Sequence, residues 1–186
     1  PGTNADAVAD LTFGLILDLS RKISLTQQYV RQGQWRTMIG NDVCHKTLGL
    51  VGFGAIAEKV AKRALGFDIK LLACDPYRKE IPEEFKGRVA LCDKDRLLAE
   101  SDIISAHLPL NEETRHILSY REIAKMKRGS FLINTSRGGI VDEQAVADAL
   151  SSGLLAGAAF DVLEKEPLSE DCPVAGFENV VITSHI

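Results

Sequence analysis

The sequence predicts an α/β fold of three layers, a doubly wound parallel sheet with helices on both of its faces. Short runs rich in Val, Ile and Leu alternate with helical segments between residues 47 and 183. Strands that are apolar on both faces are typical of the interior of a parallel sheet. The first of these runs leads into a turn with two glycines and then into a helix. A chain of 186 residues, 45% of them hydrophobic, is long enough for one sizeable core, so we expect a single domain.

The chain opens with a predicted helix over residues 4–23, where apolar side chains recur near helical spacing and Asn4 is the expected cap. Residues 24–46 are more polar, and we call them the arm. Because a Trp in a polar stretch often anchors an interface, Trp35 predicts an interdomain or subunit contact. Residues 164–178 contain two prolines, a glycine and several acids, which predicts a loop outside the sheet. Strands are predicted at residues 47–51, 69–74, 89–91, 103–107, 131–134, 156–160 and 180–183, and helices at 55–65, 93–100, 120–125 and 142–150.

The composition excludes several classes of partner. The formal net charge is −4 and the basic residues are scattered, so no basic face is offered to nucleic acid or an anionic membrane. The longest apolar stretch, residues 11–19, is interrupted by Asp18 and is too short to cross a bilayer. The four cysteines lie far apart and form no Cys-x-x-Cys pair, which argues against zinc and against a disulfide framework. We expect a cytoplasmic protein without a metal ion. Since the chain begins without Met and ends directly after a strand, we also expect a domain excised from a longer protein.

The turn Gly52-Phe53-Gly54-Ala55-Ile56-Ala57 predicts a dinucleotide-binding site of the Rossmann type. A Gly-x-Gly-x-x-Gly match is weak by itself, and here it gains weight from the strand before it and the helix after it. Gly52 allows the tight turn, and Gly54 lets the pyrophosphate approach the backbone. Ala57 replaces the third glycine and is small enough for close helix–strand packing. We expect the phosphates to bind free N–H groups at the start of the helix, near Ala55 and Ile56.

Asp75 ends the second strand of this unit, 75 − 54 = 21 positions after Gly54. A carboxylate there can accept hydrogen bonds from both ribose hydroxyls and would repel a 2′-phosphate, which favours NAD over NADP. Arg78 lies nearby and keeps NADP open. The simpler alternative is that Asp75 is only a turn residue before Pro76.

Three later segments are distinctive, and His185 completes the set. The segments are His107-Leu108-Pro109-Leu110 with Glu113-Thr114, Ile133-Asn134-Thr135-Ser136-Arg137-Gly138-Gly139 with Val141-Asp142, and Ala159-Phe160-Asp161-Val162 with Glu166-Pro167. They resemble the D-isomer-specific 2-hydroxyacid dehydrogenases, a family that includes phosphoglycerate, D-lactate and glyoxylate/hydroxypyruvate enzymes. From Thr47 onward the resemblance covers nearly the whole chain.

The resemblance implies that Arg137 anchors a substrate carboxylate, that His185 is the acid/base and that Glu166 pairs with His185. It also implies an NAD-dependent D-2-hydroxyacid dehydrogenase, represented by its NAD-binding domain without the substrate-binding domain. The substrate would be a small 2-hydroxy or 2-keto acid, and the region of the arm would support a homodimer. Asp161 would hold the nicotinamide amide, and Asp142 would cap the helix after the Arg137 loop. Further cofactor contacts are implied for Leu108, Pro109, Thr114, Thr135 and Ser136, together with Arg137 and His185.

These residue types suit the reaction. Oxidation of a 2-hydroxy acid moves a hydride from C2 to the nicotinamide while a base takes the hydroxyl proton. A histidine, with a reference pKa of about 6.5, can be that base near neutral pH, and a carboxylate such as Glu166 would favour the protonated form that the reverse reaction needs. The planar fork of Arg137 can pair with a carboxylate and polarise the keto oxygen.

Each of these roles has a simpler alternative. Arg137 could bind the carbonyl groups at a helix C-terminus, His185 could be a surface residue and Glu166 a solvated loop acid. A formate-type dehydrogenase is disfavoured, because that relative is expected to carry Gln in place of Glu166. An NAD-sensing regulator or corepressor of the same fold also stays open, and turnover of 2-keto acids would distinguish it from an enzyme. The fragment alone is expected to bind NAD with little turnover, because no second wall excludes water.

Overall fold

The computed structural model describes residues 4–186. Every predicted strand and helix is present, with ends that differ from the predicted ones by at most two residues. The strands are β1 Thr47–Val51, β2 Lys70–Cys74, β3 Val89–Leu91, β4 Ile103–Ala106, β5 Ser130–Asn134, β6 Leu155–Phe160 and β7 Val180–Ile182. The helices are α1 Ala5–Arg21, α2 Ile23–Arg31, α3 Ala55–Leu65, α4 Lys94–Glu100, α5 Tyr120–Ile123 and α6 Glu143–Ser151, with a short 3-10 helix, η1, at Glu83–Phe85.

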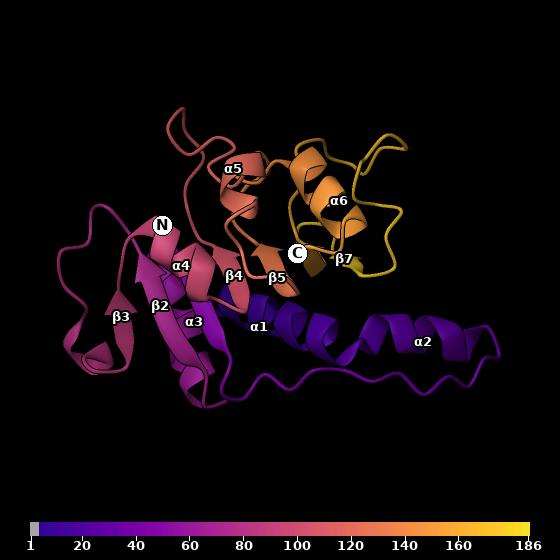
Figure 1. The fold of residues 1–186 in the computed structure, drawn as a ribbon, viewed down its shortest axis with the longest axis horizontal. Helices are drawn as coiled ribbons and strands as arrows, with labels where there is room; N and C mark the ends of the chain where they lie inside the picture. The colour runs from indigo at the N-terminus through magenta and orange to yellow at the C-terminus, as the bar shows by residue number, and fades with distance from the viewer. Residues whose placement is uncertain (1–3) are drawn as a thin grey trace.

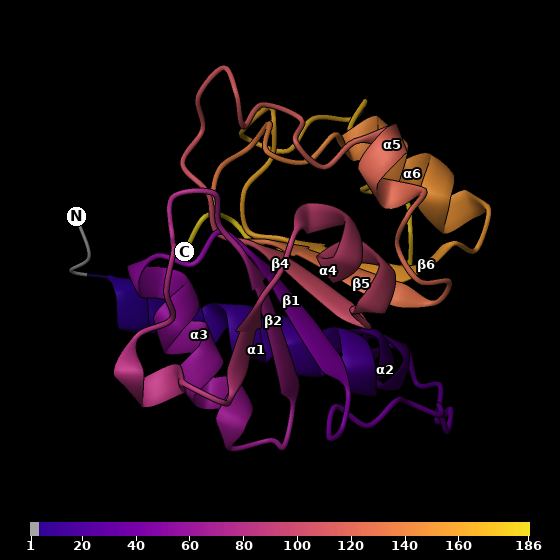
Figure 2. The same cartoon turned by 60° about the vertical axis from the view of Figure 1, so that its left-hand side comes forward.

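The strands form one seven-stranded sheet in the order β3-β2-β1-β4-β5-β6-β7, and all neighbours are parallel. Helices α1 and α3 cover one face, while α4, α5 and α6 cover the other (Figures 1 and 2). The predicted three-layer, doubly wound fold is confirmed. The order of strands reverses between β1 and β4, and ligands of open α/β sheets bind outside the carboxyl ends of the strands at such a point.

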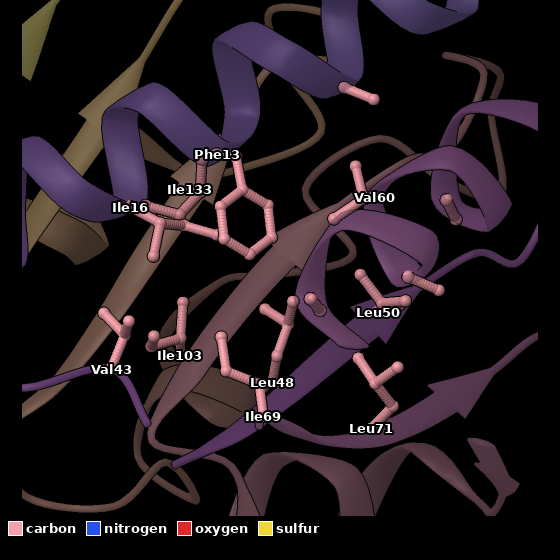
Figure 3. Packing of buried hydrophobic residues seen from close by; sticks show 14 of the residues in the cluster. Phe13, Ile16, Val43, Leu48, Leu50, Val60, Ile69, Leu71, Ile103 and Ile133 are labelled. Atoms are coloured by element: carbon pink, nitrogen blue, oxygen red, sulfur yellow. The ribbon is translucent and has the colours of Figure 1, made fainter. Parts of the chain in front are cut away.

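The core has two halves because successive strand residues point to opposite faces of the sheet. Leu48 and Ile133 pack under α1 and α3, and Figure 3 shows Ile133 beside Phe13 and Ile16 of α1. Their neighbours in the chain, such as Leu132, pack under the helices on the other face. This two-sided burial is the reason that most positions of the strands are apolar.

Two features at the N-terminal end differ from the sequence-based expectation. The arm contains most of a second helix, α2, which follows a left-handed residue, Lys22, with φ of 57°. Helix α2 is only nine residues long and buries none of its side chains, and the mostly polar composition of residues 24–46 does not indicate a helix. Asn4 does occupy the cap position of α1, but its side chain makes no capping hydrogen bond. The arm projects beyond the sheet in Figure 1.

No helix formed by residues 4–186 combines the length and apolar character that a membrane crossing needs.

Candidate active site

The glycine turn after β1 lies at the reversal of strand order. Gly52 has φ of +88°, and a Cβ atom there would lie 2.6 Å from the carbonyl oxygen of His107 at the end of β4. Only glycine suits both the conformation and the close approach. Gly54 and Ala55 are exposed, and within the described residues no side chain caps α3. The first N–H groups of α3 are therefore open at the carboxyl edge, which is the arrangement that binds a phosphate.

Asp75 lies directly beside this turn. One carboxylate oxygen accepts a hydrogen bond from the Phe53 N–H and the other from the Tyr77 N–H, both at 2.9 Å. Asp75 therefore stabilises the local turn, as the simpler alternative predicts. Each of its carboxylate oxygens still has a second lone pair that can accept a hydrogen bond from a ligand. Arg78 donates to the Phe53 carbonyl at 2.9 Å and forms an ion pair with Glu58. The positive charge of Arg78 is compensated within the chain, which weakens its attraction for a 2′-phosphate.

His185 and Glu166 form a pair at the far side of the same edge. The Nδ1 atom of His185 lies 2.9 Å from Oε2 of Glu166, and Oε1 of Glu166 accepts from the Leu163 N–H at 3.0 Å. The hydrogen bond from His185, and after it the one from the Leu163 N–H, lowers the pKa of the Glu166 carboxyl below its usual range. A carboxylate at Nδ1 favours the tautomer with its proton on Nδ1. The Nε2 atom of His185 is then the ring nitrogen left to exchange a proton.

Asp161 holds the chain segment that carries His185. Its Oδ1 atom accepts from the hydroxyl of Thr183 at 2.6 Å and from the Ile186 N–H at 3.1 Å. His185 between them has φ of 60°, in the left-handed region. A cavity of about 570 Å³ opens here, and its walls include Asp161, Glu166, Leu168, Thr183 and His185. The sheet edge thus joins three of the implied site residues around one space.

Arg137 lies on the loop after β5 and does not line that cavity. It is exposed, and its Nη1 atom donates to the carbonyl of Ser136 at 2.6 Å. The buried side chain of Asn134 shapes the loop by donating to the Arg137 carbonyl at 3.0 Å and accepting from Ser136. Gly138 packs against the backbone of Leu163, so the Arg137 loop and the Glu166 loop are in direct contact.

The other implied cofactor residues lie along this edge. Leu108 packs against the position of Gly52. Thr114 donates to the Pro109 carbonyl at 2.6 Å and so closes the loop after β4. Thr135 and Ser136 are buried. The hydroxyl of Thr135 lies 2.8 Å from that of Thr12 of α1, and the hydroxyl of Ser136 donates to Asn134.

Asp142 accepts from the Ala145 N–H at 3.1 Å, so it caps α6 as expected.

The ring of His107 is buried, which lowers its pKa to about 4.

Residues 13–186 match the family model of the D-isomer specific 2-hydroxyacid dehydrogenase, NAD binding domain. The chain belongs to this family. The family resemblance and the predicted cofactor, NAD, are thereby confirmed.

Several proteins with known names are similar to this chain over nearly all of its length. A glyoxylate reductase of Korarchaeum cryptofilum is 41% identical over 191 residues, which cover 100% of the chain and 57% of that protein. A hydroxypyruvate reductase of Thermotoga maritima is 42% identical, with 100% and 61% covered. The D-lactate dehydrogenase of Aquifex aeolicus, solved with NAD and lactic acid, superposes with a TM-score of 0.87 at 32% identity and covers 98% of the chain and 60% of its own. The chain spans about three fifths of the length of these relatives.

Two residues that organise the candidate site have no role in the sequence-based interpretation. Asn134 stands inside a segment that carried the resemblance, and a polar residue at the end of an apolar strand is the signal that could have found it. Glu143 follows the cap of α6, and its position in the sequence is typical of an acidic residue in the first turn of a helix. Nothing in the sequence indicates that it is buried.

Proposed function

We propose that this chain is the cofactor-binding part of an enzyme that interconverts a small 2-keto acid and the corresponding D-2-hydroxy acid with NAD. The observation that carries the proposal is the His185–Glu166 pair, which borders a cavity at the same sheet edge as the open N-terminus of α3. Relatives named as glyoxylate and hydroxypyruvate reductases support this class of substrate. The cytoplasm is the proposed location.

The residues along the edge fit a bound dinucleotide. The turn at Gly52 and Gly54, with Ala55 and Ile56, would hold the pyrophosphate on free N–H groups. Asp75 would take the ribose hydroxyls with its remaining lone pairs. Leu108, Pro109 and Thr114 would border the adenosine side, the backbone at Thr135 and Ser136 would border the middle, and Asp161 would hold the nicotinamide amide.

The chemistry assigns one task to each catalytic residue. Bound NADH supplies the hydride that reaches C2 of the keto acid. The keto oxygen takes a proton from Nε2 of His185, which leaves a neutral imidazole and a hydroxy acid. Glu166 holds Nδ1 and stabilises the protonated ring before this transfer. Arg137 would turn from the Ser136 carbonyl to bind the substrate carboxylate with two parallel hydrogen bonds.

The test is turnover by the full-length protein that carries this chain. With NADH, we expect reduction of at least one of glyoxylate, hydroxypyruvate and pyruvate, followed as loss of absorbance of the reduced nicotinamide. Tight NADH binding without reduction of any 2-keto acid would instead support an NAD-sensing regulator. This chain alone is expected to bind NADH and to show little turnover, because it offers no second wall to exclude water.

Asp75→Ala is expected to weaken NADH binding by this chain about 30-fold, because two hydrogen bonds worth roughly 1 kcal/mol each are lost. NADPH binding should weaken less, since the repulsion of the 2′-phosphate is removed as well. Calorimetric titration with both dinucleotides measures the change. Exposed Glu80 provides the control, because Glu80→Ala removes the same charge near the site. An unchanged ratio of NADH to NADPH affinity would contradict the role of Asp75.

We propose that the arm contacts a second copy of this chain. Trp35 and Ile39 are 89% and 88% exposed, and they lie on the segment that projects beyond the sheet (Figure 1). A groove of about 680 Å³ between the arm and β7 offers a surface for the partner copy. The double variant Trp35→Ser, Ile39→Ser is expected to sediment as a monomer where the wild type sediments as a dimer. Tyr77→Ser, a change of an exposed aromatic residue outside the arm, is the control.

A further inference from the structure

Glu143 is a buried acid on a helix that is otherwise amphipathic. It begins α6 and is 7% exposed. A charged carboxylate in such a place is costly unless hydrogen bonds compensate for the lost water. Burial raises the pKa of the Glu143 carboxyl above its usual range, and repulsion from the neighbouring Glu164 carboxylate raises it further. A role outside α6 would explain why an acid occupies this position.

The partner of Glu143 lies on the loop after β6. Its Oε1 atom accepts from the backbone N–H of Glu164 at 2.6 Å, and the thiol of Cys172 lies 3.9 Å from its Oε2 atom. The side chain of Glu164 turns away to His116, whose Nε2 atom is 2.9 Å from it. Glu143 therefore binds the loop through the main chain and leaves the Glu164 carboxylate to another partner.

This bond lies next to the catalytic carboxylate. Glu164 is two residues before Glu166, and the bond from the Leu163 N–H to the Glu166 carboxylate closes the short loop that contains both. Leu163 is in turn packed on Gly138 of the Arg137 loop. The backbone of residues 163–164 is thus held from α6 on one side and from Gly138 on the other.

We propose that Glu143 is a positioning residue, which fixes the loop at residues 163–166 so that Glu166 meets Nδ1 of His185. The catalytic consequence rests on the proposed function, whereas the placement of Glu166 and His185 does not. The role requires an oxygen acceptor at this position and not a negative charge as such.

Two variants of similar size separate the acceptor from other roles. Glu143→Gln keeps a carbonyl oxygen that can accept from Glu164, and Glu143→Met removes it. Gln144→Met is the matched control, because it places the same side chain at the next, exposed position of α6. Thermal unfolding of all three identifies any variant that is unfolded at the assay temperature.

The first measurement is nitrogen NMR of the His185 imidazole in this chain. We expect the wild type, Glu143→Gln and Gln144→Met to show one tautomer protonated on Nδ1, and Glu143→Met to show a mixture. Amide exchange of Glu164 in the wild type adds a test that needs no variant, since its N–H should be protected. A freely exchanging Glu164 amide, or a single wild-type tautomer in folded Glu143→Met, would overturn the inference.

The second measurement is steady-state kinetics of the full-length protein. Glu143→Met is expected to lower kcat about 10- to 100-fold, in keeping with the cost of a small misplacement of a catalytic group. KM for the keto acid should change little, and Glu143→Gln should restore kcat. Equal damage in Glu143→Gln and Glu143→Met would reject the acceptor role. Absence of turnover in the wild type, with the NMR results as expected, would reject the proposed function and leave the positioning role standing.

Discussion

His185→Asn is expected to lower kcat of the full-length protein about 10²- to 10⁴-fold, which is the usual contribution of a general acid or base. The variant has no group that can protonate the keto oxygen. Asparagine is the appropriate replacement because His185 has φ of 60°, and Asn tolerates the left-handed region better than Ala does. NADH affinity should remain close to that of the wild type, since the glycine turn and Asp75 lie elsewhere on the edge.

The measurement combines steady-state reduction of the best 2-keto acid with calorimetric titration of NADH. His116→Asn is a matched control, because His116 also has a positive φ, 49°, and also pairs with a glutamate, Glu164, at 2.9 Å. It does not line the 570 Å³ cavity. Normal turnover by His185→Asn would contradict the assignment of His185 as the acid/base residue.

Gly138→Ala is expected to damage both stability and turnover. The new Cβ atom would overlap the carbonyl oxygen of Leu163 and lie 2.5 Å from its carbonyl carbon and 3.0 Å from the Glu164 nitrogen. All three are backbone atoms, so no side-chain rotation relieves the clash, and the Glu166 loop must move. Overpacking of this kind costs about 1–3 kcal/mol of unfolding free energy, and a shift of about 1 Å at a catalytic group can lower kcat roughly 10²-fold.

Urea unfolding followed by circular dichroism measures the first effect, and turnover by the full-length protein measures the second. Gly176→Ala is the control, because Gly176 also lies in a loop and a Cβ atom there meets nothing within 4 Å. If Gly138→Ala unfolds at the same urea concentration as the wild type and turns over normally, the two loops do not depend on the contact that the structure shows.

Much of the fold could be predicted from the sequence because its signals are local. Buried strands of a parallel sheet are apolar in most positions on both faces, and the helices between them follow the 3.6-residue period. The turn at Gly52 and the acid at Asp75 are also local signals, since each is tied to the end of a strand. Helix α2 is not predicted because it is only nine residues long and lies in a mostly polar stretch, although its residues are amphipathic.

The features of the candidate site also fall into those that the sequence determines and those that only the tertiary structure decides. The sequence by itself determined the residue types, namely the glycine turn, Asp75 and the segments that carry His185 and Glu166. Only the tertiary structure decided how they are supported: Asp75 on the Phe53 N–H, Glu143 on the Glu164 N–H and Gly138 against Leu163. These contacts join residues 21 to 25 positions apart, for example 164 − 143 = 21 and 163 − 138 = 25. They arise because loops from different parallel strands end at one edge, where packing and not sequence spacing selects the partners.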